Sequence, residues 1–158
     1  MNVREIEIAD IADIFSLMQA KAKFDGRPES LKLDENKIEE VFFSNSPKAK
    51  AIVATIDGKV IGIATYYDIF STFIAKPGLW LDDLYIDESH RKSGAGKALV
   101  TKLCQIAKSN GCARIDWIVA DNNKNGKGFY NALGATIFDG IRHSRLDESA
   151  IHQLAESV

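Results

Sequence analysis

Cysteine is scarce in this sequence of 158 residues, which contains only Cys104 and Cys112. Their spacing fits neither a metal site nor a redox pair, so the sequence predicts no bound metal. The amino-terminal stretch MNVREIEIAD contains no apolar run of the length found in secretory signals. We therefore expect a cytoplasmic protein in which both thiols are reduced.

Long hydrophobic runs and an excess of one charge are also absent. No segment approaches the about 20 apolar residues that a membrane-spanning helix needs, so we expect no membrane partner. The formal net charge is −2, whereas nucleic-acid-binding domains usually carry a basic face, so we expect no nucleic-acid partner. Hydrophobic residues make up 46% of the chain, which is enough for one domain over residues 1–158 with a sizeable core.

The pattern of apolar residues predicts a mixed α/β fold. Alternation in VREIEIA indicates a strand, the apolar stripe from Ile11 to Ala22 indicates a helix, and Asp34 is placed to cap a second helix. Two β-rich runs flank Asp57-Gly58, a favoured hairpin turn. The remaining elements are expected in this order: a strand over 79–87, a long helix ending near Gly111, a strand over 113–121, a short helix over 123–133, a strand over 135–138, and a terminal helix capped by Asp147.

This order implies a largely antiparallel central sheet flanked by helices. Hairpin strands come first and one strand–helix–strand crossover comes later. The crossover brings strands 79–87 and 113–121 into one sheet, with the long helix packed across it.

A glycine-containing loop, RKSGAG at residues 91–96, joins the first of these crossover strands to the long helix. Gly94 and Gly96 have no side chain, so a ligand can approach the backbone closely. The first N–H groups of a helix are unpaired donors at the positive end of its dipole. Such a strand, glycine turn and helix form an anion site suited to phosphate, and Arg91, Lys92 and Lys97 add positive charge.

Two familiar phosphate-binding motifs do not fit this loop. A Walker A loop needs glycine where Arg91 stands, and serine or threonine where Ala98 stands. The dinucleotide fingerprint needs a third glycine where Leu99 stands. That fingerprint also belongs early in a doubly wound sheet, whereas this loop follows an antiparallel hairpin.

RKSGAG resembles the (Arg/Gln)-x-x-Gly-x-(Gly/Ala) signature of the GNAT acyltransferases. The stretch NNKNGKGFYNALGA is similar to a second stretch of that family: Asn123, Phe129, Tyr130 and Gly134 are in place, and Gly126 stands where alanine is usual. LWLDDLYID and AKAKFDG further resemble the diamine (spermidine/spermine-type) and thialysine acetyltransferases, in which glutamate is usual at the position of Asp82. The resemblance extends from Ile11 to Gly134. It implies the GNAT fold, acetyl-CoA as co-substrate, and a homodimer.

The resemblance also implies roles for individual residues. The loop would hold the pyrophosphate of acetyl-CoA, and the strand Leu84–Ile86 would pair with its pantetheine arm. The implied cofactor-binding residues are Leu84, Tyr85, Ile86, Arg91, Lys92, Ser93, Gly94, Ala95, Gly96, Lys97, Asn123 and Gly126. The implied acceptor-binding residues are Phe24, Asp25, Asp82, Asp83, Asp116 and Ile118. For Asn123 a role as a helix cap is equally open.

Acetyl transfer to an amine requires a base, because a lysine-like amine with a pKa of about 10.4 is protonated at pH 7. Asp82 and Asp83 lie in an otherwise apolar strand, where buried carboxylates are costly unless they have partners. We interpret Asp82 as the base and Asp83 as a binder of acceptor charge; the alternative is a structural salt bridge or a solvated strand end. Strict alternation would place Asp82 on one face with Leu84, and Asp83 on the other with Leu81.

Tyr130 is the candidate acid that protonates the departing CoA sulfur, and its alternative is an ordinary core tyrosine. Neither cysteine is in a motif typical of a nucleophile, so we expect direct attack in a ternary complex. The sequence thus predicts an acetyl-CoA-dependent N-acetyltransferase acting on a small cationic amine such as a polyamine, a diamine or a thialysine-like amino acid. A protein or peptide acetyltransferase, or a non-catalytic CoA-binding sensor module, are the alternatives.

Overall fold

The computed structural model describes residues 1–157. The chain divides into two units, Met1–Ile118 and Val119–Val158, and each is described by itself. The expectation of one domain over the whole chain stays a prediction. Within residues 1–157, no helix has the length and apolar character needed to cross a membrane.

The first unit is built on a five-stranded sheet in the order β1-β2-β3-β4-β5. All neighbouring strands are antiparallel except β4 and β5, which are parallel and are joined through α3. This confirms the predicted mixed, largely antiparallel sheet with one crossover. The elements are β1 Asn2–Glu5, η1 Ile8–Asp10, α1 Ile11–Phe24, η2 Pro28–Ser30, α2 Glu35–Phe43, β2 Lys50–Ile56, β3 Lys59–Ser71, β4 Lys76–Ile86, η3 Glu88–His90, α3 Ala95–Ser109 and β5 Ile115–Asp116.

The local signals in the sequence act where they were predicted. Asp34 caps α2, because its side chain accepts the N–H of Lys37 at 2.7 Å. Asp57 and Gly58 form the β2–β3 turn with φ angles of 50° and 80°, the left-handed conformation that this tight turn requires. Gly111 follows α3 with a φ angle of 68°, as a glycine beyond a helix end does.

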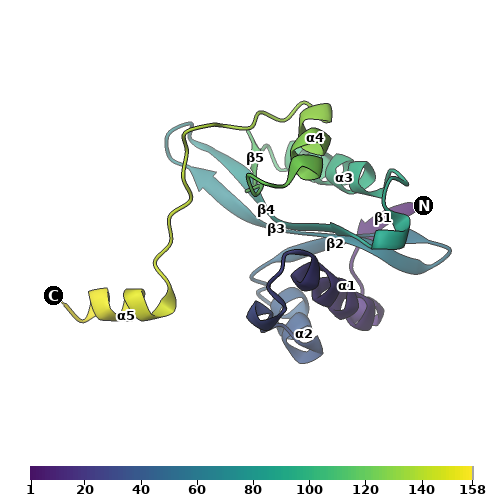
Figure 1. Cartoon of the computed structure of the whole chain (residues 1–158), viewed down its shortest axis with the longest axis horizontal. Helices are drawn as coiled ribbons and strands as arrows, with labels where there is room; N and C mark the ends of the chain where they lie inside the picture. The colour runs from purple at the N-terminus through teal and green to yellow at the C-terminus, as the bar shows by residue number, and fades with distance from the viewer. Residues whose placement is uncertain (158) are drawn as a thin grey trace. The chain divides into compact units, whose positions relative to one another are not determined.

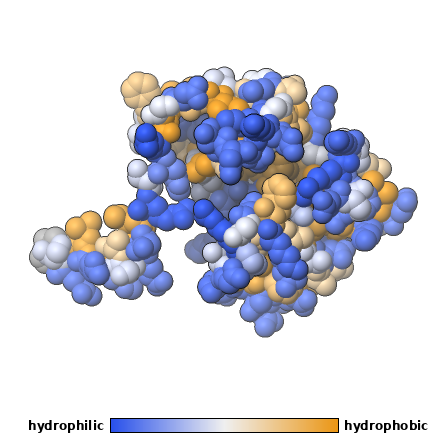
Figure 2. Space-filling model, viewed as in Figure 1, coloured by the Kyte–Doolittle hydropathy of each residue, from blue (hydrophilic) through white to orange (hydrophobic). Residues whose placement is uncertain are grey.

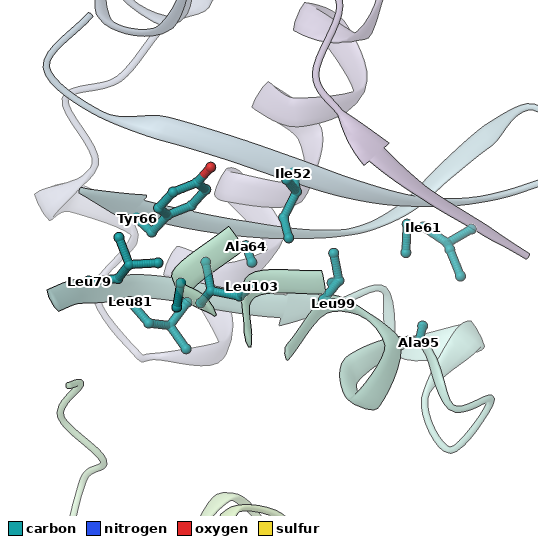
Figure 3. Packing of buried hydrophobic residues seen from close by; sticks show 11 residues of the cluster. Ile52, Ile61, Ala64, Tyr66, Leu79, Leu81, Ala95, Leu99 and Leu103 are labelled. Atoms are coloured by element: carbon teal, nitrogen blue, oxygen red, sulfur yellow. The ribbon is translucent and has the colours of Figure 1, made fainter. Parts of the chain in front are cut away.

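Helices cover both faces of this sheet: α1 and α2 pack on one face and α3 on the other (Figure 1). Figure 3 shows the core beneath α3, where Leu99 and Leu103 are fully buried against Leu79 and Leu81 of β4. Burial of a leucine side chain contributes about 1.5–3 kcal/mol, so these contacts fix α3 firmly on the sheet. The second core cluster lies under α1 and α2 and includes the fully buried Ile14, Ile38, Val53 and Ile63.

One feature of β4 contradicts the predicted alternation. Thr65 of β3 pairs with Asp83, but the next residue, Tyr66, pairs with Leu81, so Asp82 is an extra, bulged residue. Beyond the bulge the faces exchange, and Leu84 packs in the α3 cluster together with Leu81. Asp82 and Asp83 therefore do not point to opposite faces, as strict alternation predicted, but both line the same hollow on the α1–α2 side.

The second unit contains α4 Lys124–Ala132 and α5 Glu148–Ala155, and Asp147 caps α5 by accepting the N–H of Ala150 at 2.9 Å. Two strand predictions were wrong. In the described part of the chain, residues 135–138 form no strand, and the strand expected over 113–121 is reduced to Ile115–Asp116. Strand propensity is realised only where a neighbouring strand offers a ladder, and β4 pairs with β5 over just two residues.

Candidate active site

The glycine loop leads directly into α3. Gly94 is the residue before the helix, and its φ angle of 89° is one that residues with a side chain rarely adopt. The first helical bond runs from the Ala98 N–H to the Gly94 carbonyl at 3.0 Å. The N–H groups of Gly96 and Lys97 precede that bond, so the helix itself supplies no acceptor for them. These donors, at the positive end of a 15-residue helix, suit a phosphate group.

A hollow of about 430 Å³ begins at this loop and runs along α3. Gly94 and Lys97 line it at the start of the helix, and Lys102 and Gln105 line it further along. Both lysines give the hollow a positive lining. Its position next to the loop donors is appropriate for a ligand with several anionic groups.

Arg91 connects the loop with the end of α1. Its guanidinium lies over the ring of Phe24, 4.7 Å from the centroid, and 5.7 Å from the centroid of Tyr85. Phe24 is 57% exposed, so this cation–π contact is at the surface. Arg91 was predicted at the cofactor, and Phe24 at the acceptor. The structure brings these two residues into contact.

The backbone of β4 is open on one side beyond the bulge. Residues Leu84–Ile86 pair with Ala64–Gly62 of β3 on one edge, whereas β5 reaches only Leu79 and Trp80 on the other. Within residues 1–157, no strand continues the ladder beside Leu84–Ile86 on the β5 side. An extended chain with amide groups could pair with this edge, as predicted for the pantetheine arm.

The carboxylates of Asp82 and Asp83 lie in a second hollow, of about 280 Å³, on the α1–α2 side of the sheet, which we call the acidic hollow. Asp82 and Asp83 form its acidic part, and Met18, Val41 and Phe42 belong to its apolar wall. Burial raises the pKa of Asp82, and the neighbouring Asp83 charge raises it further, while the Trp80 indole N–H and the Lys21 cation oppose the shift. A carboxylate with a raised pKa is a stronger base than an ordinary one, and apolar walls suit the methylene chain of an alkylamine.

Asp83 is held by protein groups on two sides. Its Oδ1 lies 2.9 Å from Nζ of Lys21, and its Oδ2 accepts a hydrogen bond from the Thr65 hydroxyl at 3.2 Å. Lys21 also contacts Asp25, with 2.5 Å between Nζ and Oδ2. The structure thus joins the predicted acceptor residues Asp25 and Asp83 through a lysine that the sequence analysis did not identify.

Lys21 could have been found from the sequence, because it lies four residues before Asp25 on a predicted helix, a spacing that favours an ion pair. Thr65 could not, because it reaches Asp83 only through the pairing of β3 with β4. The other predicted acceptor residues are not among those that line the acidic hollow. Asp116 forms an ion pair with Arg114 at 2.8 Å, and Ile118 is 54% exposed at the end of the first unit.

The second unit carries three further predicted residues on one short helix, α4. The Asn123 side chain caps this helix by accepting the Gly126 N–H at 2.8 Å. A Cβ at position 126 would lie 2.6 Å from Nδ2 of Asn123, so glycine here makes room for the cap. Tyr130 follows on the same helix, partly buried, with its ring centroid 5.2 Å from that of Phe129.

Similarity to known proteins indicates the family of this chain. The model of the Acetyltransferase (GNAT) family matches residues 11–135. The chain is 27% identical to the thialysine N-epsilon-acetyltransferase of Mus musculus over 98% of this chain and 96% of the mouse protein. It is 34% identical to the L-ornithine N5-acetyltransferase of Arabidopsis thaliana, over 62% of this chain and 43% of the plant protein.

A solved structure is similar along the whole chain. The integron cassette protein from the mobile metagenome of V. cholerae has a TM-score of 0.80 and 23% identity, over 99% of this chain and 98% of that one. The predicted family resemblance is therefore confirmed. The chain belongs to the GNAT family of acetyltransferases.

Proposed function

We propose that this GNAT acetyltransferase moves the acetyl group of acetyl-CoA to a primary amine of a small cationic acceptor, by direct attack in a ternary complex. Relatives named for thialysine and L-ornithine support an acceptor with an amine on an alkyl chain. The chemistry requires a cofactor loop, a base for the ammonium, and an acid for the leaving thiolate.

The acidic hollow is the observation that carries this proposal. It combines apolar walls from α1 and α2 with a carboxylate, Asp82, whose pKa is raised by burial and by Asp83. An ammonium group drawn to Asp82 could transfer its proton there and become a nucleophile. The bulge that directs Asp82 into the hollow is on the same strand as the open edge Leu84–Ile86, to which we assign the pantetheine arm.

The remaining roles follow from the residues that the loop and α4 supply. We assign the pyrophosphate to the N–H groups of Gly96 and Lys97 and to the lysines of the adjoining hollow. Backbone N–H groups near Leu84 and Tyr85 would stabilise the developing oxyanion. We assign Tyr130 as the acid that protonates the CoA sulfur. Neither cysteine lines the acidic hollow, which favours direct attack over an acyl-enzyme.

The test is turnover of acetyl-CoA with a panel of alkylamines, basic amino acids, polyamines, aminoglycosides and peptides. Release of the CoA thiol gives the rate, and mass spectrometry identifies the acetylated product. We expect turnover with small primary amines and intersecting initial-rate plots; parallel plots would contradict direct attack. Activity with peptides alone would favour a protein acetyltransferase, and acetyl-CoA binding without any turnover would favour a sensor. We also propose a homodimer, which sedimentation would test.

A further inference from the structure

A cation of the protein's own, Lys21, lies beside the acidic hollow and contacts one of its lining residues, Asp83. Lys21 comes from α1, and its side chain is only 21% exposed. Burial alone would lower the pKa of Lys21, but the hydrogen bond to Asp25 and the charge of Asp83 outweigh it and hold the pKa above the ordinary value. Lys21 is therefore an ammonium group at neutral pH, placed 2.9 Å from a carboxylate that lines the acceptor hollow.

This lysine makes the two strand carboxylates unequal. Asp83 has an ion pair with Lys21 and a hydrogen bond with Thr65. For Asp82, no ion pair is present within residues 1–157, and its carboxylate opens into the hollow. Lys32 lines the hollow itself, whereas Lys21 reaches it only through its contact with Asp83. The hollow thus offers an acceptor one carboxylate that has no ion pair. Lys32 in its lining and Lys21 beside it repel any further positive charge.

We propose that Lys21 is a specificity-determining residue: its ammonium occupies the position at Asp83 where a second acceptor cation would bind, so the enzyme discriminates against diamines and polyamines. Amino acids such as thialysine and ornithine also have a second ammonium group, but the adjacent carboxylate offsets its charge. This inference rests on the proposed function and narrows it. The reacting ammonium binds at Asp82, and the methylene chain lies against Met18 and Phe42. A second ammonium at Asp83 would have to displace Lys21 from that carboxylate.

A series of five-carbon amines isolates the effect of the second charge. Pentylamine has one ammonium, cadaverine has a second one at the far end, and 5-aminopentanoate has a carboxylate there. For the unmodified enzyme we expect kcat/KM to be at least about 10-fold higher for pentylamine than for cadaverine, since specificity is a difference of binding free energies. Because Lys32 lines the hollow, 5-aminopentanoate should react at least as well as pentylamine.

Lys21→Met keeps the aliphatic stem and removes the charge, which leaves Asp83 free for a second ammonium. The preference for pentylamine over cadaverine should fall by about 10-fold or more. Lys21→Arg keeps the charge and should preserve the preference. Lys37→Met is the matched control, because Lys37 forms an exposed ion pair with Glu40 at 2.5 Å outside the hollow, and it should change nothing.

The pH dependence of kcat/KM distinguishes an electrostatic role of Lys21 from a purely structural one. The groups that act on the Asp82 carboxyl are Asp83, Lys21 and the Trp80 N–H, and Tyr67 is the other group that senses its charge. Since the Lys21 cation lowers the pKa of Asp82, Lys21→Met should shift the acidic limb of kcat/KM for pentylamine to higher pH. Lys21→Arg should leave that limb in place.

The outcomes separate this inference from the proposed function. Equal use of cadaverine and pentylamine by the unmodified enzyme would overturn the role of Lys21 while acetylation of amines stood, and this measurement needs no folded variant. An unchanged preference for pentylamine over cadaverine in a folded Lys21→Met enzyme would also overturn the role of Lys21. If the unmodified enzyme acetylated no amine at all, both the role of Lys21 and the proposed function would be contradicted.

Discussion

The decisive substitution for the mechanism is Asp82→Asn, which removes the proposed base and changes the side chain's size very little. Asp82 is a bulged residue at an open hollow, so the amide should be accommodated without repacking. The variant can react only with amine that is already neutral. For a lysine-like amine with a pKa of about 10.4, the neutral fraction is about 1 in 2,500 at pH 7 and about 1 in 25 at pH 9.

These fractions set the size and the pH dependence of the effect. At pH 7 we expect kcat/KM to fall by about 10²–10⁴-fold, the range of general base catalysis. The defect should then shrink by about 10-fold for each pH unit up to pH 9, because the neutral amine becomes more abundant. In the unmodified enzyme, Asp82 must be ionised to act, and its pKa is raised, so activity should be lost on acidification at a higher pH than an ordinary carboxyl would give.

The assay is CoA thiol release at saturating acetyl-CoA, with pentylamine from pH 5 to pH 9. Asp68→Asn is the matched control: Asp68 lies on β3 next to the same strand, is exposed, and pairs with Lys50 at 2.6 Å outside the hollow. The control should keep the parental profile. A folded Asp82→Asn enzyme within twofold of the parent at pH 7, or with a defect that does not change with pH, would refute Asp82 as the base.

Further predictions concern the other assigned roles. Tyr130→Phe should lower kcat by about 10²–10⁴-fold with little change in KM for acetyl-CoA, and full activity would return Tyr130 to the role of a packing residue. Gly96→Val should abolish acetyl-CoA binding, measured by calorimetry, while the fold stays intact, and Gly96→Ala should weaken binding less. Unchanged affinity of a folded Gly96→Val variant would exclude the loop as the phosphate site. Asn123→Ala should cost about 1 kcal/mol in the free energy of unfolding as a lost cap. Gly126→Ala alone should be nearly neutral, because the better helix propensity of alanine is offset by displacement of the Asn123 cap. In the Asn123→Ala background the same substitution should be stabilising. If the two substitutions had additive effects on the free energy of unfolding in urea, the contact between positions 123 and 126 would be contradicted.

Much of the fold could be predicted because its signals are local. The Asp34 cap, the Asp57-Gly58 turn and the end of α3 at Gly111 each depend on a few neighbouring residues. The strand expected at 135–138 failed, since four apolar and β-branched residues form a strand only when a partner strand is available. The glycine loop of the candidate site is likewise a local signal. The contact of Arg91 with Phe24 is not local, because it joins residues that are far apart in the sequence.

The bulge at Asp82 explains why sequence alone could identify the acidic pair but not its arrangement. In a regular strand, adjacent carboxylates point to opposite faces, and one of them would face the leucine-rich core under α3. The extra residue lets Leu81 and Leu84 share that core and brings both carboxylates to the α1–α2 side. There burial and the charge of Asp83 raise the pKa of Asp82, and Lys21 forms an ion pair with Asp83. The irregularity that breaks the alternation thus also places the proposed base next to a carboxylate that has an ion pair, and a pattern of period two cannot reveal it.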